Sequence, residues 1–202
     1  MTLIKSISGI RGTIGGAIGD NLTPLDAVKF TASYAKWLVG KNPGRKLTVV
    51  VGRDARLSGE MVNDLVEGTL LGCGVNVINV GLCTTPGVEM AVVARKADGG
   101  IILTASHNPK QWNALKLLNE RGEFLNAAEG AAILECAEKE EFTFVDVDSL
   151  GCMEEKDFTD EHLDAVLALD AVDVEAVRNA HFKVALDAVN SVGGIIMPRL
   201  LE

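Results

Sequence analysis

The sequence contains no apolar run long enough to cross a membrane. Stretches such as Ile101-Ile102-Leu103 fall far short of the about 20 residues that a membrane-spanning helix needs. Residues 1–6 lack the long apolar stretch and the small-residue cleavage site of a signal peptide. Pro and Gly make up 26 of the 202 residues without a repeating period, and 48% of the residues are apolar, so a collagen-like or disordered chain is excluded. We therefore expect a folded cytoplasmic protein of one to two domains without a membrane partner.

Cysteine pairs and several common catalytic signatures are also missing. Cys73, Cys83, Cys136 and Cys152 form no C-x-x-C pair and are too sparse for a disulfide scaffold, so we expect them to be small buried side chains. The sequence has no G-x-x-x-x-G-K-[ST], no H-E-x-x-H and no G-x-S-x-G. The glycine-rich residues 9–16 do not open a helix after a strand with dinucleotide-binding spacing. Common nucleotide and zinc chemistries are therefore not indicated.

Positive charge is scarce overall and unevenly distributed. The net charge of −9 argues against nucleic acid as a partner. Residues 1–125 nevertheless contain 14 Lys and Arg against 10 Asp and Glu, a net charge of +4, whereas residues 126–202 have a net charge of −13. The first part of the chain is therefore suited to an anionic ligand.

Apolar stretches of strand length alternate with stretches of helical periodicity. Strands are expected at residues 47–51, 75–80 and 100–104, with helices at 58–72 and from Pro86 to about Arg95. Continuous apolar strands joined by helices predict a buried parallel sheet with right-handed crossovers. A helix from Pro24 to Gly40, with Thr23 as its N-cap, is expected to cover that sheet. The predicted fold class is α/β, a three-layer α/β/α domain with a mainly parallel mixed sheet.

The rest of the chain predicts the end of this domain and the start of a similar one. A hairpin is expected at residues 113–125 with its turn at 119–122, followed by a helix from Asn126 to about Glu141. We assign residues 1–148 to the first domain and 149–202 to a linker and the truncated start of a second α/β domain. The latter is predicted to contain a helix over 157–179, a strand over 182–187, a loop over 190–194 and a further helix. Such a start cannot bury a core of its own, so we interpret the chain as a fragment of a longer protein.

The most reactive segment is Thr104-Ala-Ser-His-Asn-Pro109, which follows the third predicted strand. Open α/β sheets build their sites at the carboxyl ends of parallel strands. Ser106 offers a nucleophilic hydroxyl, His107 offers an imidazole that can accept or donate a proton, and Asn108-Pro109 forms a turn. The alternative is a polar turn that only links a strand to a hairpin.

Two other groups of polar residues allow structural and functional interpretations. Arg53, Asp54 and Arg56 follow the first predicted strand at the same sheet edge and can brace the Ser106 loop, either through an ion pair of Asp54 with an arginine or by contact with substrate. His162 and His181 lie far from every motif, and we expect both to be ordinary surface or helix-end residues.

These segments together resemble the α-D-phosphohexomutases, the family of phosphoglucomutase, phosphomannomutase and phosphoglucosamine mutase. Thr104–Pro109 matches the active-serine signature T-A-S-H-N-P, and Asn113–Lys116 is similar to the N-G-x-K that follows it, with Ala114 in place of glycine. The similarity extends to Ser8–Gly12, which resembles the G-x-R-G turn, to Val51–Arg56, which resembles the G-x-D-x-R loop, to Thr85-Pro86, and to Phe182–Gly194, which resembles the opening of the second domain. Ala114 is expected to restrict the loop backbone slightly, because alanine disfavours positive φ.

The resemblance implies a phosphorylated Ser106 that passes its phosphoryl group to a hexose monophosphate and regains the other phosphate from the bisphosphate intermediate. It also implies Mg²⁺, with phosphorylated Ser106 as one ligand. The remaining ligands in the family are aspartates of a D-G-D-x-D-R loop, which this sequence does not contain. The metal site, and with it the activity of this chain alone, is therefore expected to be incomplete without the missing domains.

The resemblance further implies roles for the neighbouring polar residues. His107 and Lys116 would move the proton of the attacking sugar hydroxyl, and Arg11 would neutralise phosphate charge. Thr104, Asn108 and Arg53 would support the phosphate-carrying loop. The predicted function is the interconversion of hexose 1-phosphate and hexose 6-phosphate; the identity of the hexose stays open. The alternatives are a catalytically silent phosphosugar-binding or interaction module and, more weakly, a phosphatase.

Overall fold

The computed structural model describes residues 1–6 and 9–202, so Ser8 of the N-terminal motif lies outside the described residues. The strands, in chain order, are β1 (Ile4–Ser6), β2 (Gly9–Thr13), β3 (Thr48–Arg53), β4 (Asn76–Leu82), β5 (Gly99–Leu103), β6 (Trp112–Leu118) and β7 (Met153–Glu155). The helices are α1 (Pro24–Lys41), α2 (Gly59–Gly72), α3 (Thr85–Ala94), α4 (Ala127–Lys139), α5 (Thr159–Leu167), α6 (Val174–Asn179) and α7 (Gly193–Leu201).

The strands form one mixed sheet in the order β1-β2-β6-β5-β3-β4-β7. β5, β3, β4 and β7 run parallel, which confirms the predicted parallel arrangement of the three apolar strands. β6 pairs antiparallel with both β5 and β2. The predicted short hairpin at 113–125 is confirmed: its turn lies at 119–122, and an antiparallel bridge joins Leu118 to Phe124. β6 also pairs with β2, a strand about 100 residues earlier in the chain.

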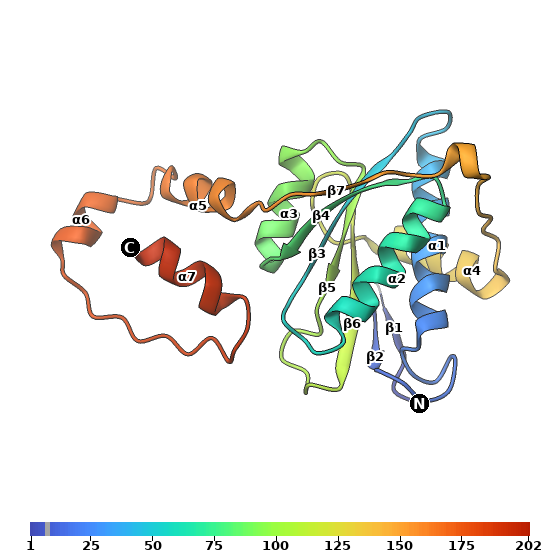
Figure 1. Ribbon diagram of the computed structural model, residues 1–202, viewed down its shortest axis with the longest axis horizontal. Helices are drawn as coiled ribbons and strands as arrows, with labels where there is room; N and C mark the ends of the chain where they lie inside the picture. Colours follow the sequence, from blue (N-terminus) through green and yellow to red (C-terminus); the bar gives the residue numbers. More distant parts are fainter. Residues whose placement is uncertain (7–8) are drawn as a thin grey trace.

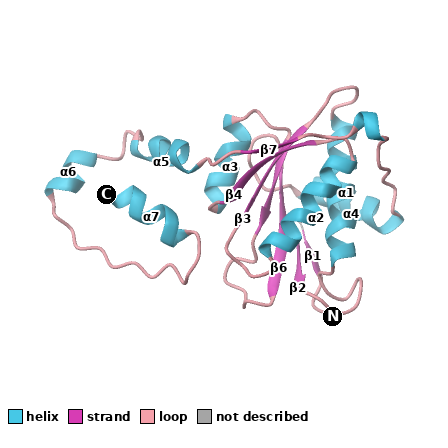
Figure 2. Cartoon of the chain, viewed as in Figure 1, coloured by secondary structure: helices cyan, strands magenta, loops and turns pink. Residues whose placement is uncertain are grey.

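Helices cover both faces of the sheet, as a three-layer α/β/α fold requires (Figures 1 and 2). One core cluster joins α1, α2 and α4 to the sheet and includes Phe30, Val66 and Ile133. A second cluster packs α3 on the opposite face. β3 is buried on both faces, because Val49, Val50 and Val51 are all 0% exposed. This explains why the strand reads as a continuous apolar run rather than an alternating one.

The predicted helix starts are confirmed where a side chain caps the first turn. Thr23 and Asp26 form a capping box at the start of α1, and Asn126 and Glu129 form another at the start of α4. Ser58 precedes α2, but its hydroxyl makes no cap hydrogen bond. The Ser58 hydroxyl instead accepts a hydrogen bond of 3.0 Å from the Asn113 side chain, which ties α2 to β6.

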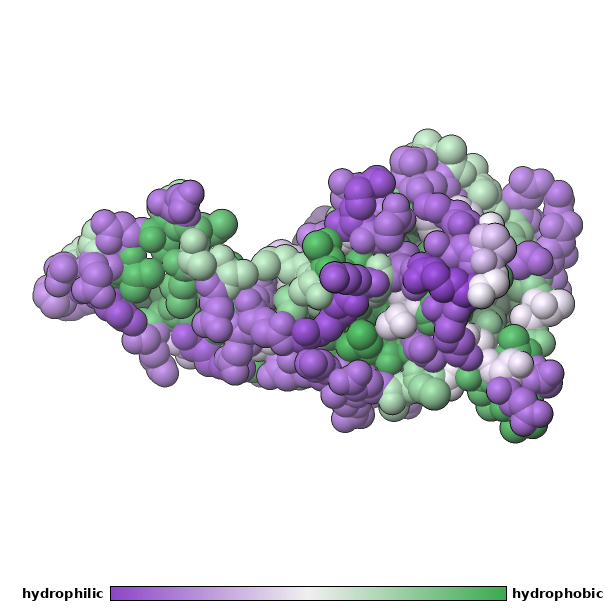
Figure 3. Space-filling model, turned by 90° about the horizontal axis from the view of Figure 1, so that it is seen from above, coloured by the Kyte–Doolittle hydropathy of each residue, from purple (hydrophilic) through white to green (hydrophobic). Residues whose placement is uncertain are grey.

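The chain after residue 148 first adds β7 to the sheet edge beside β4 and then leaves the sheet as an arm (Figure 1). The helix predicted over 157–179 is two helices, α5 and α6, separated by turns at 168–173. Residues 182–187 form no strand, because no strand of the described chain lies beside them to complete their hydrogen bonds. Phe182 is 71% exposed there, and apolar side chains also gather on the arm around α5 to α7 (Figure 3).

Burial corrects two expectations for titratable residues. Of the cysteines only Cys83 is buried, where burial raises its pKa to about 11, whereas Cys73 and Cys136 are half-buried and Cys152 is exposed. His162 lies at a helix end, in the first turn of α5, as one of the two expectations had it, but it is buried rather than at the surface, and burial lowers its pKa. None of the helices in the described part of the chain is long and apolar enough to cross a membrane.

Candidate functional site

Ser106 lies in the loop that follows β5, at the carboxyl edge of the parallel strands, as predicted. Its backbone adopts the left-handed conformation with φ of 53°. This conformation costs a residue with a side chain about 1–2 kcal/mol, so the surrounding structure must hold it in place. The Ser106 side chain is exposed and free to meet a ligand.

The conformation is supported by a chain of side-chain hydrogen bonds. The Ser106 amide donates to the Thr104 hydroxyl at 3.0 Å, and that hydroxyl donates to Asp54 at 2.6 Å. Arg56 pairs with the same Asp54 carboxylate, with 3.1 Å between Nε and Oδ2. The structure therefore connects the loop after β3 with the loop after β5, and Thr104 supports the Ser106 backbone.

Arg53 does not take part in this support. Its guanidinium pairs with Glu60 at 3.1 Å and donates to the Asp54 carbonyl at 3.4 Å. It lines a separate pocket beside α2, β4 and β7. The arginine that reaches the Ser106 loop is Arg56, because a side chain three residues beyond the end of β3 can turn toward the neighbouring loop.

The other predicted site residues line one pocket of about 230 Å³ with Ser106. We call it the serine pocket, and its lining is Ser6, Gly9, Arg11, Thr104, Ala105, Ser106, His107, Asn108, Ala114, Lys116 and Phe124. Arg11 and Lys116 contribute two positive charges, and none of the described lining residues has a carboxylate. Such a pocket favours an anion, because the cations are not neutralised by acidic side chains of the pocket itself.

Pairing of β2 with β6 brings the two cations to the same side of the sheet. Arg11 lies opposite Ala114, and Lys116 is two residues further along β6. Side chains two residues apart on a strand, and those directly opposite on the neighbouring strand, share a face. Sequence spacing alone could not predict this, since Arg11 and Lys116 are separated by most of the domain.

Gly9 allows β2 to approach β6 closely. Its φ is 120°, and a Cβ at this position would clash with the carbonyl oxygen of Leu115 and lie 3.0 Å from the Lys116 Cα. Only glycine accepts both the conformation and the contact. The register that places Arg11 beside the Ser106 loop therefore depends on Gly9.

Ala114 does not have the effect expected from its departure from the family signature. It lies within β6 and does not have a positive φ. An alanine is compatible with that backbone, so no restriction of the loop results.

Phe124 is a pocket residue that the sequence did not reveal. Its ring lies 5.6 Å from the Lys116 Nζ, a cation–π distance, and it is 40% exposed. The expected turn at 119–122 was the available signal, since it brings the chain back along β6. The face on which the ring lies is decided only by the bridge from Leu118 to Phe124.

The described residues do not fit a magnesium site on their own. They contain no group of three or more His, Cys, Asp or Glu side chains that could hold a metal ion. The described lining of the serine pocket has hydroxyl groups but no carboxylate. Hard cations such as Mg²⁺ need several oxygen ligands, so further carboxylates would have to come from elsewhere.

The chain is similar to proteins of known sequence. A family model described as phosphoglucomutase/phosphomannomutase, alpha/beta/alpha domain I, matches residues 3–144. The phosphoglucomutase/phosphomannomutase of Thermococcus kodakarensis is 35% identical over 193 residues, or 95% of this chain and 42% of that protein. The phosphoglucosamine/phosphogalactosamine mutase of Sulfurisphaera tokodaii is 31% identical over 195 residues, or 93% of this chain and 40% of that protein. The chain thus spans about two fifths of the length of these relatives.

The fold also has solved counterparts. The crystal structure of a phosphoglucomutase/phosphomannomutase family protein from Burkholderia thailandensis superposes with a TM-score of 0.74 at 24% identity. The match covers 98% of this chain and 42% of that one. At this identity the likeness establishes the arrangement of strands and helices.

Proposed function

This chain belongs to the phosphoglucomutase/phosphomannomutase family through its α/β/α domain I, and from that premise we propose that Ser106 is the phosphoserine of a phosphosugar mutase. The observation that carries the proposal is the serine pocket. A serine held in a left-handed loop opens into a cavity with two cations, a histidine and no carboxylate. That arrangement suits a covalently bound phosphate and an incoming sugar phosphate.

The proposed reaction transfers the phosphoryl group between oxygen atoms. A hydroxyl oxygen of a hexose monophosphate attacks the phosphorus of phosphorylated Ser106, the bond from phosphorus to Ser106 Oγ breaks, and the proton of the sugar hydroxyl ends on Oγ. The product is a hexose bisphosphate. After it turns over in the pocket, Ser106 Oγ attacks the phosphorus of its other phosphate, the bond from that phosphorus to the sugar oxygen breaks, and the Oγ proton moves to the sugar oxygen. The isomeric monophosphate is left, and Ser106 is phosphorylated again.

The pocket residues have complementary roles in this proposal. Arg11 and Lys116 offset the about −1.5 to −2 charges of the phosphate. His107 and Lys116 carry the proton between the sugar hydroxyl and Oγ, and Thr104 keeps the Ser106 amide in place. Magnesium remains a prediction of the family resemblance, with phosphorylated Ser106 as one ligand and the others outside this chain.

A second function, binding of a phosphosugar without turnover, is favoured by the metal ligands that the described residues lack. For the same reason we propose that this chain alone does not turn over hexose 1-phosphate. Turnover of glucose 1-phosphate by the 202-residue chain would contradict that part of the proposal.

The decisive experiment uses the complete open reading frame that contains this chain. Its conversion of hexose 1-phosphate should depend on a hexose 1,6-bisphosphate activator, and mass spectrometry should find phosphate on Ser106. Ser106→Ala should lower the rate by at least about 10³-fold. Activity that survives this substitution would contradict the proposal, and phosphosugar binding without turnover would favour the silent module.

A further inference from the structure

Arg56 contacts the backbone of the Ser106 loop, and every N–H group of its guanidinium has a partner. Nε donates to Asp54, while the two terminal nitrogens donate to four backbone carbonyls at 2.7–3.0 Å. These carbonyls belong to Ser106, Asn108, Pro109 and Trp112. An arginine has five N–H donors, so none is left over for a ligand. The side chain is 10% exposed and does not line the serine pocket.

The four carbonyls extend from Ser106 to Trp112, the first residue of β6, and so cover most of the segment between β5 and β6. Within this segment the backbone makes few hydrogen bonds of its own, from the Asn108 amide to Ala105 and from the Trp112 amide to Pro109. A guanidinium is planar and rigid, so it holds all of its acceptors in one fixed arrangement. Two hydrogen bonds therefore hold the left-handed backbone of Ser106. Arg56 donates to its carbonyl oxygen, and its amide donates to the Thr104 hydroxyl.

We propose that Arg56 is a positioning residue for Ser106, which acts through the geometry of the loop and not through its charge on the phosphate. The effect of Arg56 on the reaction rests on the proposed function, whereas its effect on the geometry of the loop does not. Charge neutralisation falls to Arg11 and Lys116, the cations that do line the pocket. Arg56 positions the Ser106 hydroxyl that carries the phosphate.

This role distinguishes arginine from lysine at position 56. A lysine ammonium keeps the positive charge but has three donors on a single atom, which cannot reach four carbonyls and Asp54 together. Arg56→Lys and Arg56→Met should therefore have similar effects. Arg53→Met is the matched control, because it removes the same charge at the same sheet edge from an arginine that pairs with Glu60.

The test on this chain is amide hydrogen exchange followed residue by residue. Both Arg56 variants should increase exchange at the amides of Ser106, Asn108 and Trp112 by at least about tenfold, because opening of the loop becomes easier. Amides in the ladder between β3 and β5 should keep their protection, and Arg53→Met should leave all of them unchanged. Wild-type protection of the loop in Arg56→Lys would overturn the proposal, and that variant decides the question if Arg56→Met does not fold.

A second measurement tests the consequence for the reaction in the complete open reading frame. Arg56→Lys should lower kcat by about 100-fold, the effect of a misplaced reacting group, while the KM for hexose phosphate stays nearly unchanged. A raised KM with wild-type kcat would show instead that Arg56 binds substrate. If loop exchange responds as expected but the wild-type protein has no mutase activity, the proposed function is contradicted. The positioning of the loop by Arg56 would then still stand.

Discussion

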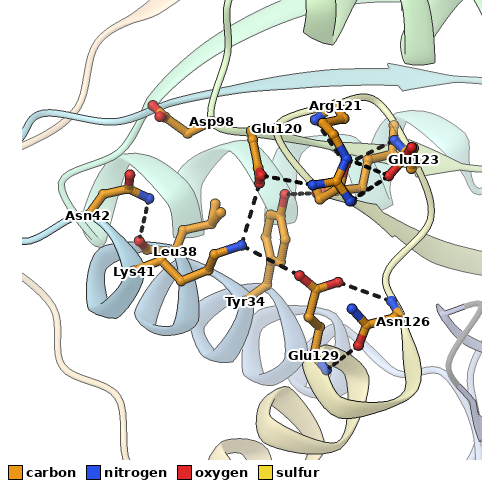
Figure 4. Close-up of polar contacts among 12 residues, drawn as sticks. Tyr34, Leu38, Lys41, Asn42, Asp98, Glu120, Arg121, Glu123, Asn126 and Glu129 are labelled. Atoms are coloured by element: carbon orange, nitrogen blue, oxygen red, sulfur yellow. Dashed lines mark hydrogen bonds and ion pairs between the residues drawn. The ribbon is translucent and has the colours of Figure 1, made fainter.

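Two regions of this molecule use lysine and arginine in opposite ways. In the serine pocket, Arg11 and Lys116 face a cavity in which no residue of the part of the chain described supplies a carboxylate to the lining. At the other end of β5 and β6, basic and acidic side chains form a group that we call the ion-pair cluster (Figure 4). Its members are Lys41, Glu120, Arg121, Glu123 and Glu129.

In the ion-pair cluster each cation already has acidic partners. Lys41 lies 3.5 Å from both Glu120 and Glu129, so α1 is tied to the turn after β6 and to α4. Arg121 donates to Glu123 and is the first cause of the lowered pKa of that carboxyl. Cations with carboxylate partners hold elements together, whereas cations without them in a pocket are available to an anionic ligand.

The register of β2 against β6 is the feature whose loss should damage the serine pocket most. Gly9→Ala should lower the free energy of unfolding by about 2–4 kcal/mol, because it combines positive φ with a clash against β6. Urea denaturation measures the change. Gly15→Ala is the control, since its φ is 88° but no atom lies within 4 Å of a Cβ there. Equal losses for the two variants would show that the clash with β6 is unimportant.

Removing a positive charge from the serine pocket should weaken hexose phosphate binding, whereas removing one from the ion-pair cluster should not. Arg11→Met should weaken the binding of hexose phosphate to the complete protein by about 10–100-fold, since a charge-assisted hydrogen bond contributes about 1.5–3 kcal/mol. Lys41→Met removes the same charge from the ion-pair cluster and should leave binding unchanged. Titration calorimetry of both variants checks this, and an equal loss in Lys41→Met would mean that overall charge and not the pocket attracts the phosphate.

Tyr34 anchors the ion-pair end of the domain from inside the core. Its hydroxyl donates to the Leu118 carbonyl at 2.7 Å, and burial raises the pKa of the phenol above its ordinary value. Tyr34→Phe should lower the free energy of unfolding by about 0.5–1.5 kcal/mol through the lost hydrogen bond. Hexose phosphate binding should not change; weaker binding would show that the two ends of β5 and β6 are coupled.

Lys41→Met should change the free energy of unfolding least of these substitutions. Exposed ion pairs contribute about 0.2–1 kcal/mol, and both of its pairs are partly exposed. The loss in free energy of unfolding should shrink further at high salt, because salt screens surface charges. A loss well above 1 kcal/mol that does not respond to salt would point to packing of the lysine stem on Trp37, which lies 4.6 Å from its Nζ.

The sequence was sufficient to predict the elements that depend on contacts between residues close together in the chain. Thr23 and Asn126 start helices because their side chains cap neighbouring amides, and the Val49–Val51 run forms a strand because both of its faces are buried. The reactive loop was found from its residue types and its place after a strand. The same reasoning failed for residues 182–187, because a strand needs a neighbour, and it did not predict that β2 pairs with β6.

The amino-acid sequence by itself determined the α/β class, the caps and the loop that carries Ser106, since these depend on contacts between residues close in the chain. Only the tertiary structure decided that Arg56 and not Arg53 supports that loop, that Arg11 and Lys116 share a face, and that Phe124 joins them. Each of these depends on strand order and register. Hydrogen bonds between segments far apart in the chain set both, and spacing along the sequence does not report them.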